Sequence, residues 1–133
     1  MLYSMKDACQ KTGMSYENLK FYCNEGLVPN VKRDSHNYRV FSEQDIQWIQ
    51  GLNCLKSCGM GIADMKEYTA LCLQGEASIP QRKQILESKR EQLMQSIAEL
   101  ENAIAYIDKK QQFYDDVLSG KISYYSNLLP QKT

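Results

Sequence analysis

The C-terminal third of the chain carries apolar residues at a seven-residue spacing. Two rows of positions, offset by four residues, are apolar except for one Arg and one Gln. The first row is Leu86, Leu93, Leu100, Ile107 and Tyr114, and the second is Arg90, Ile97, Ile104, Gln111 and Leu118. Two such rows, maintained over about four heptads, predict a coiled-coil helix. The polar members are typical of residues that set the register of a coiled coil.

The predicted helix is too long for one small domain to cover. It begins at Ser78, with Pro80 in its first turn, and ends at Ser119, where Gly120 stops it. About 40 helical residues are about 60 Å long. We therefore expect a second copy of the chain to cover the apolar stripe, with all ten residues of the two rows in a homodimer interface. The tail, residues 120–133, is apolar enough to pack on a neighbouring surface.

The first 75 residues have a different pattern, with short helical segments separated by turn residues. Ser4 and Ser15 stand at the N-cap positions of two short helices, and Gly13 ends the first of them. Gly26 suits the left-handed conformation that often follows the end of a helix. Two short helices joined by a tight turn predict a helix-turn-helix.

A hairpin and a helical pair are expected next. The polar residues 34–37 favour a turn between two short strands, which makes a wing beside the helix-turn-helix. The expected elements are strands within 30–33 and 38–41, a third helix from Ser42 to about Cys58, and a fourth from Ile62 to about Leu73. The predicted fold is mostly α. Residues 1–75 form a winged helix-turn-helix head with the helical pair, 78–119 the dimerisation helix, and 120–133 the tail.

Charge by itself is a weak guide to the partner. The chain has 16 Lys and Arg against 16 Asp and Glu, whereas most nucleic-acid-binding domains are basic. Residues 1–42 hold six basic side chains against four acidic ones. No apolar run approaches the roughly 18 residues that span a bilayer, and Lys6 and Asp7 stand where a signal peptide would be apolar. We expect a cytoplasmic protein without a membrane partner.

Three stretches of the chain resemble the MerR family of transcription regulators. They are residues 3–27, the segment Asn37-Tyr38-Arg39-Val40-Phe41-Ser42-Glu43-Gln44-Asp45, and the helix junction Leu55-Lys56-Ser57-Cys58-Gly59-Met60-Gly61-Ile62. The resemblance is detailed over about residues 2–75 and is closest to short members that lack a separate effector domain. It implies a homodimer held by an antiparallel coiled coil. It also implies binding to a pseudo-palindromic operator in promoter DNA, which the protein bends and untwists so that RNA polymerase can engage both promoter elements.

The candidate DNA-contacting residues lie on the second helix and on the wing. Polar side chains at the start of a helix can enter a major groove, and side chains of a wing can hold the phosphate backbone. The candidates are Tyr16, Glu17, Asn18, Lys20, Tyr22, Arg33, His36, Asn37, Tyr38 and Arg39. The resemblance places Lys20, Tyr22, Tyr38 and Arg39 at family DNA-contact positions. Tyr22 can equally be a core residue, and His36 is more often simply solvated.

Three departures from the family pattern bear on the operator sequence and the affinity. Lys20 stands where the family usually has Arg, which replaces a bidentate contact by a point charge. Glu17 stands where many members have a basic residue, and Phe21 replaces a common Tyr. The binding mode itself does not depend on these positions.

The five cysteines are expected to be free thiols, because their number is odd and no export signal is visible. Cys9 and Cys23 fall on apolar faces and are expected to fill the core. Cys54 is expected to face away from that core, although Lys56 then falls near the apolar centre of the same helix. Cys54 resembles the cysteine of aldehyde- and electrophile-responsive relatives, so it is either an effector-sensing thiol or an inert one. The identity of any small-molecule effector stays open.

Other classes of function are less compatible with the sequence. Two cysteines four residues apart and a single His are too few for a closed metal site, so no metal or cofactor is expected. We expect no enzyme, because no nucleophile–base pair or Gly-rich phosphate loop is visible. A DNA-bending accessory factor of the excisionase kind would not need the long heptad helix. A coiled-coil protein-binding module remains compatible with the neutral charge.

Overall fold

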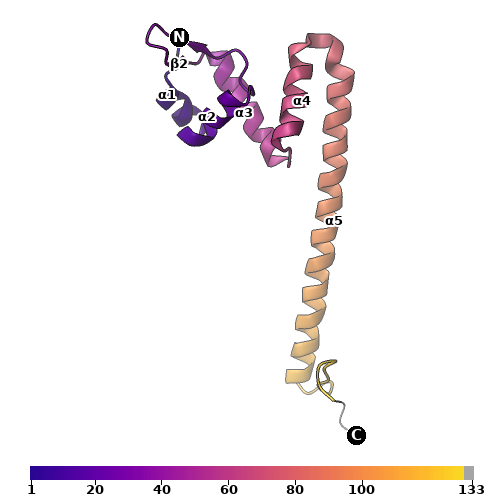
Figure 1. Ribbon diagram of the computed structural model, residues 1–133. Coiled ribbons are helices and arrows are strands. Elements are labelled where there is room, and N and C mark those ends of the chain that lie inside the picture. The colour runs from indigo at the N-terminus through magenta and orange to yellow at the C-terminus, as the bar shows by residue number, and fades with distance from the viewer. Residues whose placement is uncertain (131–133) are drawn as a thin grey trace. The chain divides into compact units, whose positions relative to one another are not determined.

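A computed structural model describes residues 1–130 and confirms the predicted order of elements (Figure 1). The elements are α1 (Met5–Thr12), α2 (Tyr16–Asn24), β1 (Lys32–Arg33), β2 (Arg39–Val40), α3 (Glu43–Ser57), α4 (Ile62–Leu73), the 3-10 helix η1 (Gly75–Ser78) and α5 (Ile79–Leu118). The chain divides into two compact units, Met1–Arg90 and Glu91–Thr133, so α5 contributes to both. The last three residues of the predicted tail lie outside the described part. No helix among residues 1–130 has the length and apolar character needed to cross a membrane.

The helix starts are capped as the sequence predicts. The Ser4 hydroxyl accepts a hydrogen bond from the backbone N–H of Asp7 at 3.1 Å, and the Ser15 hydroxyl accepts one from Asn18 at 3.2 Å. Gly13 ends α1 with φ at 71°, a left-handed conformation that glycine adopts without steric cost. These local signals set the tight turn that joins α1 to α2.

The wing is shorter than predicted, with two residues in each strand. Lys32 pairs with Val40, and Arg33 pairs with Arg39. Tyr38 belongs to the tip instead, because its N–H donates to the Asp34 carboxylate at 3.0 Å.

The far end of the second predicted strand pairs with the N-terminus of the chain. Phe41 exchanges two backbone hydrogen bonds with Tyr3, at 2.7 and 2.9 Å. This bridge between distant segments is what local sequence patterns could not reveal, and it attaches the wing to the start of α1.

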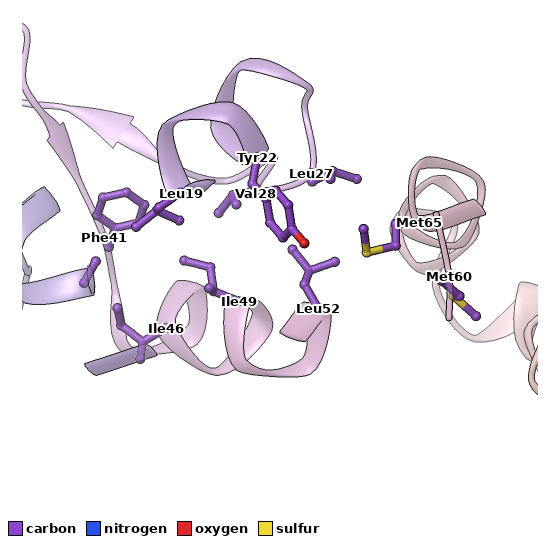
Figure 2. Packing of buried hydrophobic residues seen from close by; sticks show 11 residues of the cluster. Leu19, Tyr22, Leu27, Val28, Phe41, Ile46, Ile49, Leu52, Met60 and Met65 are labelled. Atoms are coloured by element: carbon purple, nitrogen blue, oxygen red, sulfur yellow. The ribbon is translucent and has the colours of Figure 1, made fainter. Parts of the chain in front are cut away.

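One hydrophobic core joins the first four helices and the hairpin (Figure 2). Its buried members are Ala8, Leu19, Tyr22, Leu27, Val28, Phe41, Ile46, Ile49, Leu52, Met60 and Met65. Each large apolar side chain buried in this way contributes about 1.5–3 kcal/mol. Because Leu19 of α2 and Phe41, which directly follows β2, share this core, the helix and the wing are held in a defined arrangement.

The unit that begins at Glu91 holds most of α5 and the tail. The apolar row residues on it are exposed in the single chain, as shown by exposed fractions of 63% for Leu100 and 58% for Ile104. The tail packs on the end of its own helix, because the ring of Phe113 lies 5.0 Å from that of Tyr125 in an edge-on contact. This contact places one tail ring against α5, whereas Leu128 and Leu129 stay exposed.

Candidate nucleic-acid interface

Helix α2 presents a polar face opposite a buried one. Leu19 is fully buried, whereas the neighbouring candidates are exposed to solvent. These exposed side chains are Tyr16, Glu17, Asn18 and Lys20. Their exposure agrees with the prediction that this face is free to meet a partner. Phe21, which the sequence analysis noted only as a departure from the family pattern, is also exposed at 44%.

A hollow lies between the starts of α1 and α2 and the wing. Its volume is about 450 Å³. The predicted residues that line it are Tyr16, Arg33, Asn37, Tyr38 and Arg39. The fold thus gathers half of the predicted candidates, from two segments of the chain, around one concave surface.

Lys6 also lines this hollow, although it was not among the predicted candidates. It lies on α1, so its approach to the wing depends on the tertiary fold. Together with Arg33 and Arg39 it gives the hollow three cationic side chains. Asp34 is the acidic residue of the lining, and its carboxylate accepts hydrogen bonds from the backbone N–H groups of His36 and Tyr38. The surface therefore suits a polyanion.

Two arginines are held in place by hydrogen bonds. The Arg39 guanidinium donates to the Asn24 side-chain oxygen at 2.6 Å, which ties the wing to the end of α2. The Arg33 guanidinium donates to the backbone carbonyl of Asn37 at 2.8 Å, within the wing. Asn37 itself has φ at 65°, a left-handed conformation that Asn tolerates better than most residues. Asn24 was not predicted as a site residue, and only its contact with Arg39 reveals its role.

Tyr22 is a core residue, which corrects its place among the candidate DNA contacts. Its side chain is 3% exposed, and its hydroxyl is buried without a hydrogen-bond partner among residues 1–130. Figure 2 shows the hydroxyl pointing past Leu52 toward Met65. Burial raises the pKa of the Tyr22 hydroxyl above its ordinary value. The hydroxyl cannot reach a phosphate in this conformation, because α3 and α4 cover it.

His36 lies exposed at the wing tip, outside the hollow. Its backbone N–H donates to the Asp34 carboxylate at 2.9 Å, which stabilises the turn. The imidazole is exposed to solvent. His36 can therefore be either a DNA-contacting residue or simply a solvated one.

All five cysteines are free thiols in the structure, as predicted. Cys54 is exposed on α3, in agreement with its predicted orientation away from the core. Cys9 and Cys23 pack against the core without being fully buried, and burial raises the pKa of both thiols. Within residues 1–130 no group of three or more His, Cys, Asp or Glu side chains is placed to hold a metal ion.

The position of Lys56 differs from the prediction. It is exposed, whereas the helical spacing had placed it near the apolar face of α3. Leu55 packs against the core at the end of α3 instead.

A helix-turn-helix with a hairpin wing and a cationic hollow between them defines a winged helix-turn-helix protein. The family described as "MerR HTH family regulatory protein" matches residues 3–71, more than half of the chain. The protein therefore belongs to the MerR family, as the sequence analysis predicted.

Two similar proteins are also regulators. An HTH-type transcriptional regulator of Haemophilus influenzae is 36% identical over 114 residues, which cover 86% of this chain and 84% of the relative. The HTH-type transcriptional regulator AdhR of Bacillus subtilis is 32% identical over 92 residues, which cover 69% of this chain and 66% of that protein. This chain is a MerR-family transcriptional regulator and not an enzyme.

A solved structure extends the similarity to the whole fold. The crystal structure of HiNmlR, described as a MerR family regulator lacking the sensor domain and bound to promoter DNA, shares 34% identity with a TM-score of 0.73. The match covers 90% of this chain and 94% of that one. The similarity therefore includes α5 as well as the head.

Proposed function

We propose that this protein binds a pseudo-palindromic promoter operator as a homodimer and distorts the duplex to control RNA polymerase. The observation that carries the proposal is the hollow beside α2, where Lys6, Arg33 and Arg39 come together from α1 and the wing. The DNA-bound state of the similar regulator HiNmlR supports it. A protein that binds promoters must be in the same compartment as the DNA, which is consistent with a cytoplasmic location.

In this proposal α2 enters the major groove and the wing holds the backbone. Glu17, Asn18 and Lys20 are exposed on α2, where they can meet base edges. Tyr16, at the start of α2, lines the hollow together with the wing. The wing residues Arg33, His36, Asn37, Tyr38 and Arg39 contact phosphates. Tyr22 supports α2 from within the core.

The homodimer forms through α5. Its two heptad rows run from Leu86 to Leu118 and carry large apolar side chains that are 40% exposed or more in the single chain. A second copy, packed antiparallel, would bury them and place two heads at a fixed separation, which suits a two-fold symmetric site. In this division residues 1–75 read the DNA, 78–119 dimerise, and the tail from 120 packs on the helix end.

Cys54 is the proposed effector-sensing thiol. Its exposure on α3 makes it accessible to electrophiles, which favours sensing over an inert buried thiol. Exposure to an aldehyde, followed by mass spectrometry and a gel-shift with Cys54→Ala as control, tests this role. Modification of Cys54 that changes DNA binding supports the role, whereas an unmodified Cys54 with unchanged binding contradicts it.

A gel-shift with DNA from upstream of the protein's own gene tests the main proposal. Arg39→Ala is expected to weaken binding about tenfold or more and to lower the slope of log affinity against log salt by about one, because one phosphate contact is lost. Lys83→Ala is the matched control, since Lys83 is an exposed cation on α5 away from the hollow. Circular dichroism confirms that both variants are folded.

Two outcomes would contradict the proposal. One is equal binding by the Arg39 and Lys83 variants. The other is a protein that dimerises but never shifts DNA, which would favour the alternative function of a coiled-coil protein-binding module.

A further inference from the structure

The guanidiniums of Arg33 and Arg39 have no ion-pair partner among residues 1–130. The two arginines stand directly opposite each other in the wing, and both line the hollow beside α2. Side chains that oppose each other in an antiparallel pair lie on the same face, where two like charges repel. The described part of the chain therefore leaves the positive charge of this pair without a neutralising carboxylate.

Asn24 holds the Arg39 guanidinium with an uncharged group. Asn24 is the last residue of α2, and its side-chain Oδ1 accepts the hydrogen bond from Nη2 of Arg39 at 2.6 Å. An arginine side chain can only donate, so the amide oxygen and not the amide nitrogen must face it. This guanidinium forms no other hydrogen bond with residues 1–130, which leaves its remaining N–H donors for a further acceptor.

The carboxylates close to this pair are engaged elsewhere. Glu25 directly follows Asn24, yet its carboxylate pairs with Lys66 of α4 at 2.7 Å. The Asp34 carboxylate accepts two backbone N–H groups within the turn of the wing. The neighbouring positions 24 and 25 thus present an amide to the wing and a carboxylate to α4, so the group that restrains the wing adds no negative charge to it.

We propose that Asn24 is a positioning residue for DNA binding, which holds the Arg39 guanidinium at the hollow and leaves its full positive charge for a backbone phosphate. The inference rests on the proposed function. A carboxylate at position 24 would hold Arg39 more strongly, because hydrogen bonds between charged groups are roughly twice as strong as neutral ones. It would also compete with a phosphate for the same guanidinium. The neutral amide therefore fixes the geometry of the site without lowering its charge.

Two substitutions at position 24 separate the position of the guanidinium from its charge. Asn24→Ala removes the acceptor and keeps the charge of Arg39. DNA affinity is expected to fall about fivefold, because the released side chain must be ordered on binding, while the slope of log affinity against log salt is expected to stay the same. Asn24→Asp keeps an acceptor oxygen and adds a negative charge. Affinity is expected to fall about tenfold, and the magnitude of the slope is expected to decrease by about one.

Fluorescence anisotropy of the full chain with a labelled duplex from upstream of its own gene, at several salt concentrations, measures both quantities. Asn102→Ala and Asn102→Asp are the matched controls, since Asn102 is an exposed asparagine on α5 outside the two heptad rows. Both are expected to leave affinity and slope unchanged. Circular dichroism confirms that all variants are folded.

Two further readouts distinguish positioning from a purely structural link between α2 and the wing. A structural link would make DNA affinity follow stability. In Asn24→Asp the two are expected to diverge, with a urea midpoint at least as high as that of the parent protein and weaker binding. In a double-mutant cycle, Asn24→Ala is expected to cause no further loss of affinity once Arg39→Ala has removed the guanidinium.

Two results would overturn the inference and leave the proposed function in place. One is additive losses of affinity for Asn24→Ala and Arg39→Ala. The other is an Asn24→Asp protein that binds the duplex as tightly as the parent with the same salt slope. A parent protein that binds no duplex at all would contradict the proposed function, and the inference with it.

Discussion

At the scale of single residues, the Tyr22 hydroxyl stands out as a buried side-chain oxygen without a hydrogen-bond partner among residues 1–130. It is enclosed by the core and has no partner among the described residues, while the ring around it packs well. A buried polar group without a hydrogen bond costs about 1–3 kcal/mol. The packing of the Tyr22 ring therefore stabilises the fold around α2, whereas the unpaired hydroxyl lowers the free energy of unfolding.

Tyr22→Phe is expected to raise the free energy of unfolding by about 1 kcal/mol, because it removes the unpaired hydroxyl and keeps the ring. Urea denaturation measures the change. Tyr3→Phe is the control, since the Tyr3 hydroxyl donates to the Glu43 carboxylate at 2.8 Å and its removal brings no gain. A less stable Tyr22→Phe protein would show that the hydroxyl has a partner in solution.

The same residue makes the fold sensitive to alkali. Burial raises the pKa of Tyr22 above its ordinary value of 10.0, so the folded state retains the proton longer than the unfolded state. This contribution to stability is complete below about pH 10 and is lost as the pH rises through the folded pKa. Stability is therefore expected to fall above about pH 10, and less steeply in Tyr22→Phe. Denaturation midpoints between pH 8 and 11 test this, and parallel curves for the two proteins would refute it.

At the scale of elements, α3 is the helix that connects the helix-turn-helix to the rest of the head. It begins in a capping box, where the Ser42 hydroxyl accepts from the Asp45 N–H at 3.1 Å and the Asp45 carboxylate accepts from the Ser42 N–H at 2.9 Å. Asp45 is nearly buried, and the positive end of the helix dipole stabilises its carboxylate there. Trp48 then bonds through its ring N–H to the carbonyl of Leu27 at 2.7 Å, which ties α3 to the end of α2.

Ser42→Ala is expected to lower the free energy of unfolding by about 1 kcal/mol, because it leaves the Asp45 N–H without its cap. Ser35→Ala is the matched control. Ser35 is exposed at the wing tip, and its removal is expected to change stability by less than about 0.5 kcal/mol. Thermal melting of both variants measures the difference, and equal melting temperatures would mean that the capping box does not stabilise α3.

At the scale of the whole molecule, the exposed apolar rows of α5 require an explanation. A helix of 40 residues has no buried residue in the single chain. An apolar stripe of this length in water favours association. The proposed homodimer accounts for it and also for the seven-residue spacing, which an isolated surface helix would not need.

The double variant Ile97→Asp with Leu100→Asp is expected to be monomeric at micromolar concentration, because it places charges in the middle of the interface. Light scattering measures the mass. The melting temperature of the parent protein is expected to depend on protein concentration, whereas that of the variant is expected to be independent of it. Lys109→Asp, on the helix face opposite the rows, is the control and is expected to remain dimeric. A monomeric parent protein would rule out the dimer.

Local sequence signals were enough to predict most of the secondary structure. Ser4, Ser15 and Ser42 act through bonds to residues three positions away, and Gly13 acts through its own backbone. Such interactions lie within one turn of chain and do not depend on the rest of the fold. The exposed face of α2 followed in the same way, because helical periodicity alone separates Leu19 from its polar neighbours.

Groups of residues that are distant in sequence could not be predicted in this way. Lys6 lines the cationic hollow, and the Asn24 side chain accepts a hydrogen bond from Arg39. The bridge between Tyr3 and Phe41 pairs the end of the wing with the N-terminal segment. None of these contacts can be predicted from a repeating pattern in the sequence, because each depends on how α1, α2 and the hairpin pack together.

The sequence by itself determined the order of the helices, their ends and the heptad rows of α5, since these follow from interactions between residues close along the chain. Only the tertiary structure decided which side chains share a surface. It buried the Tyr22 hydroxyl beneath α4 and placed the Arg82 guanidinium beside the Cys72 sulfur. The physical reason is that burial and electrostatic environment depend on every element packed around a group, and packing is a property of the whole fold.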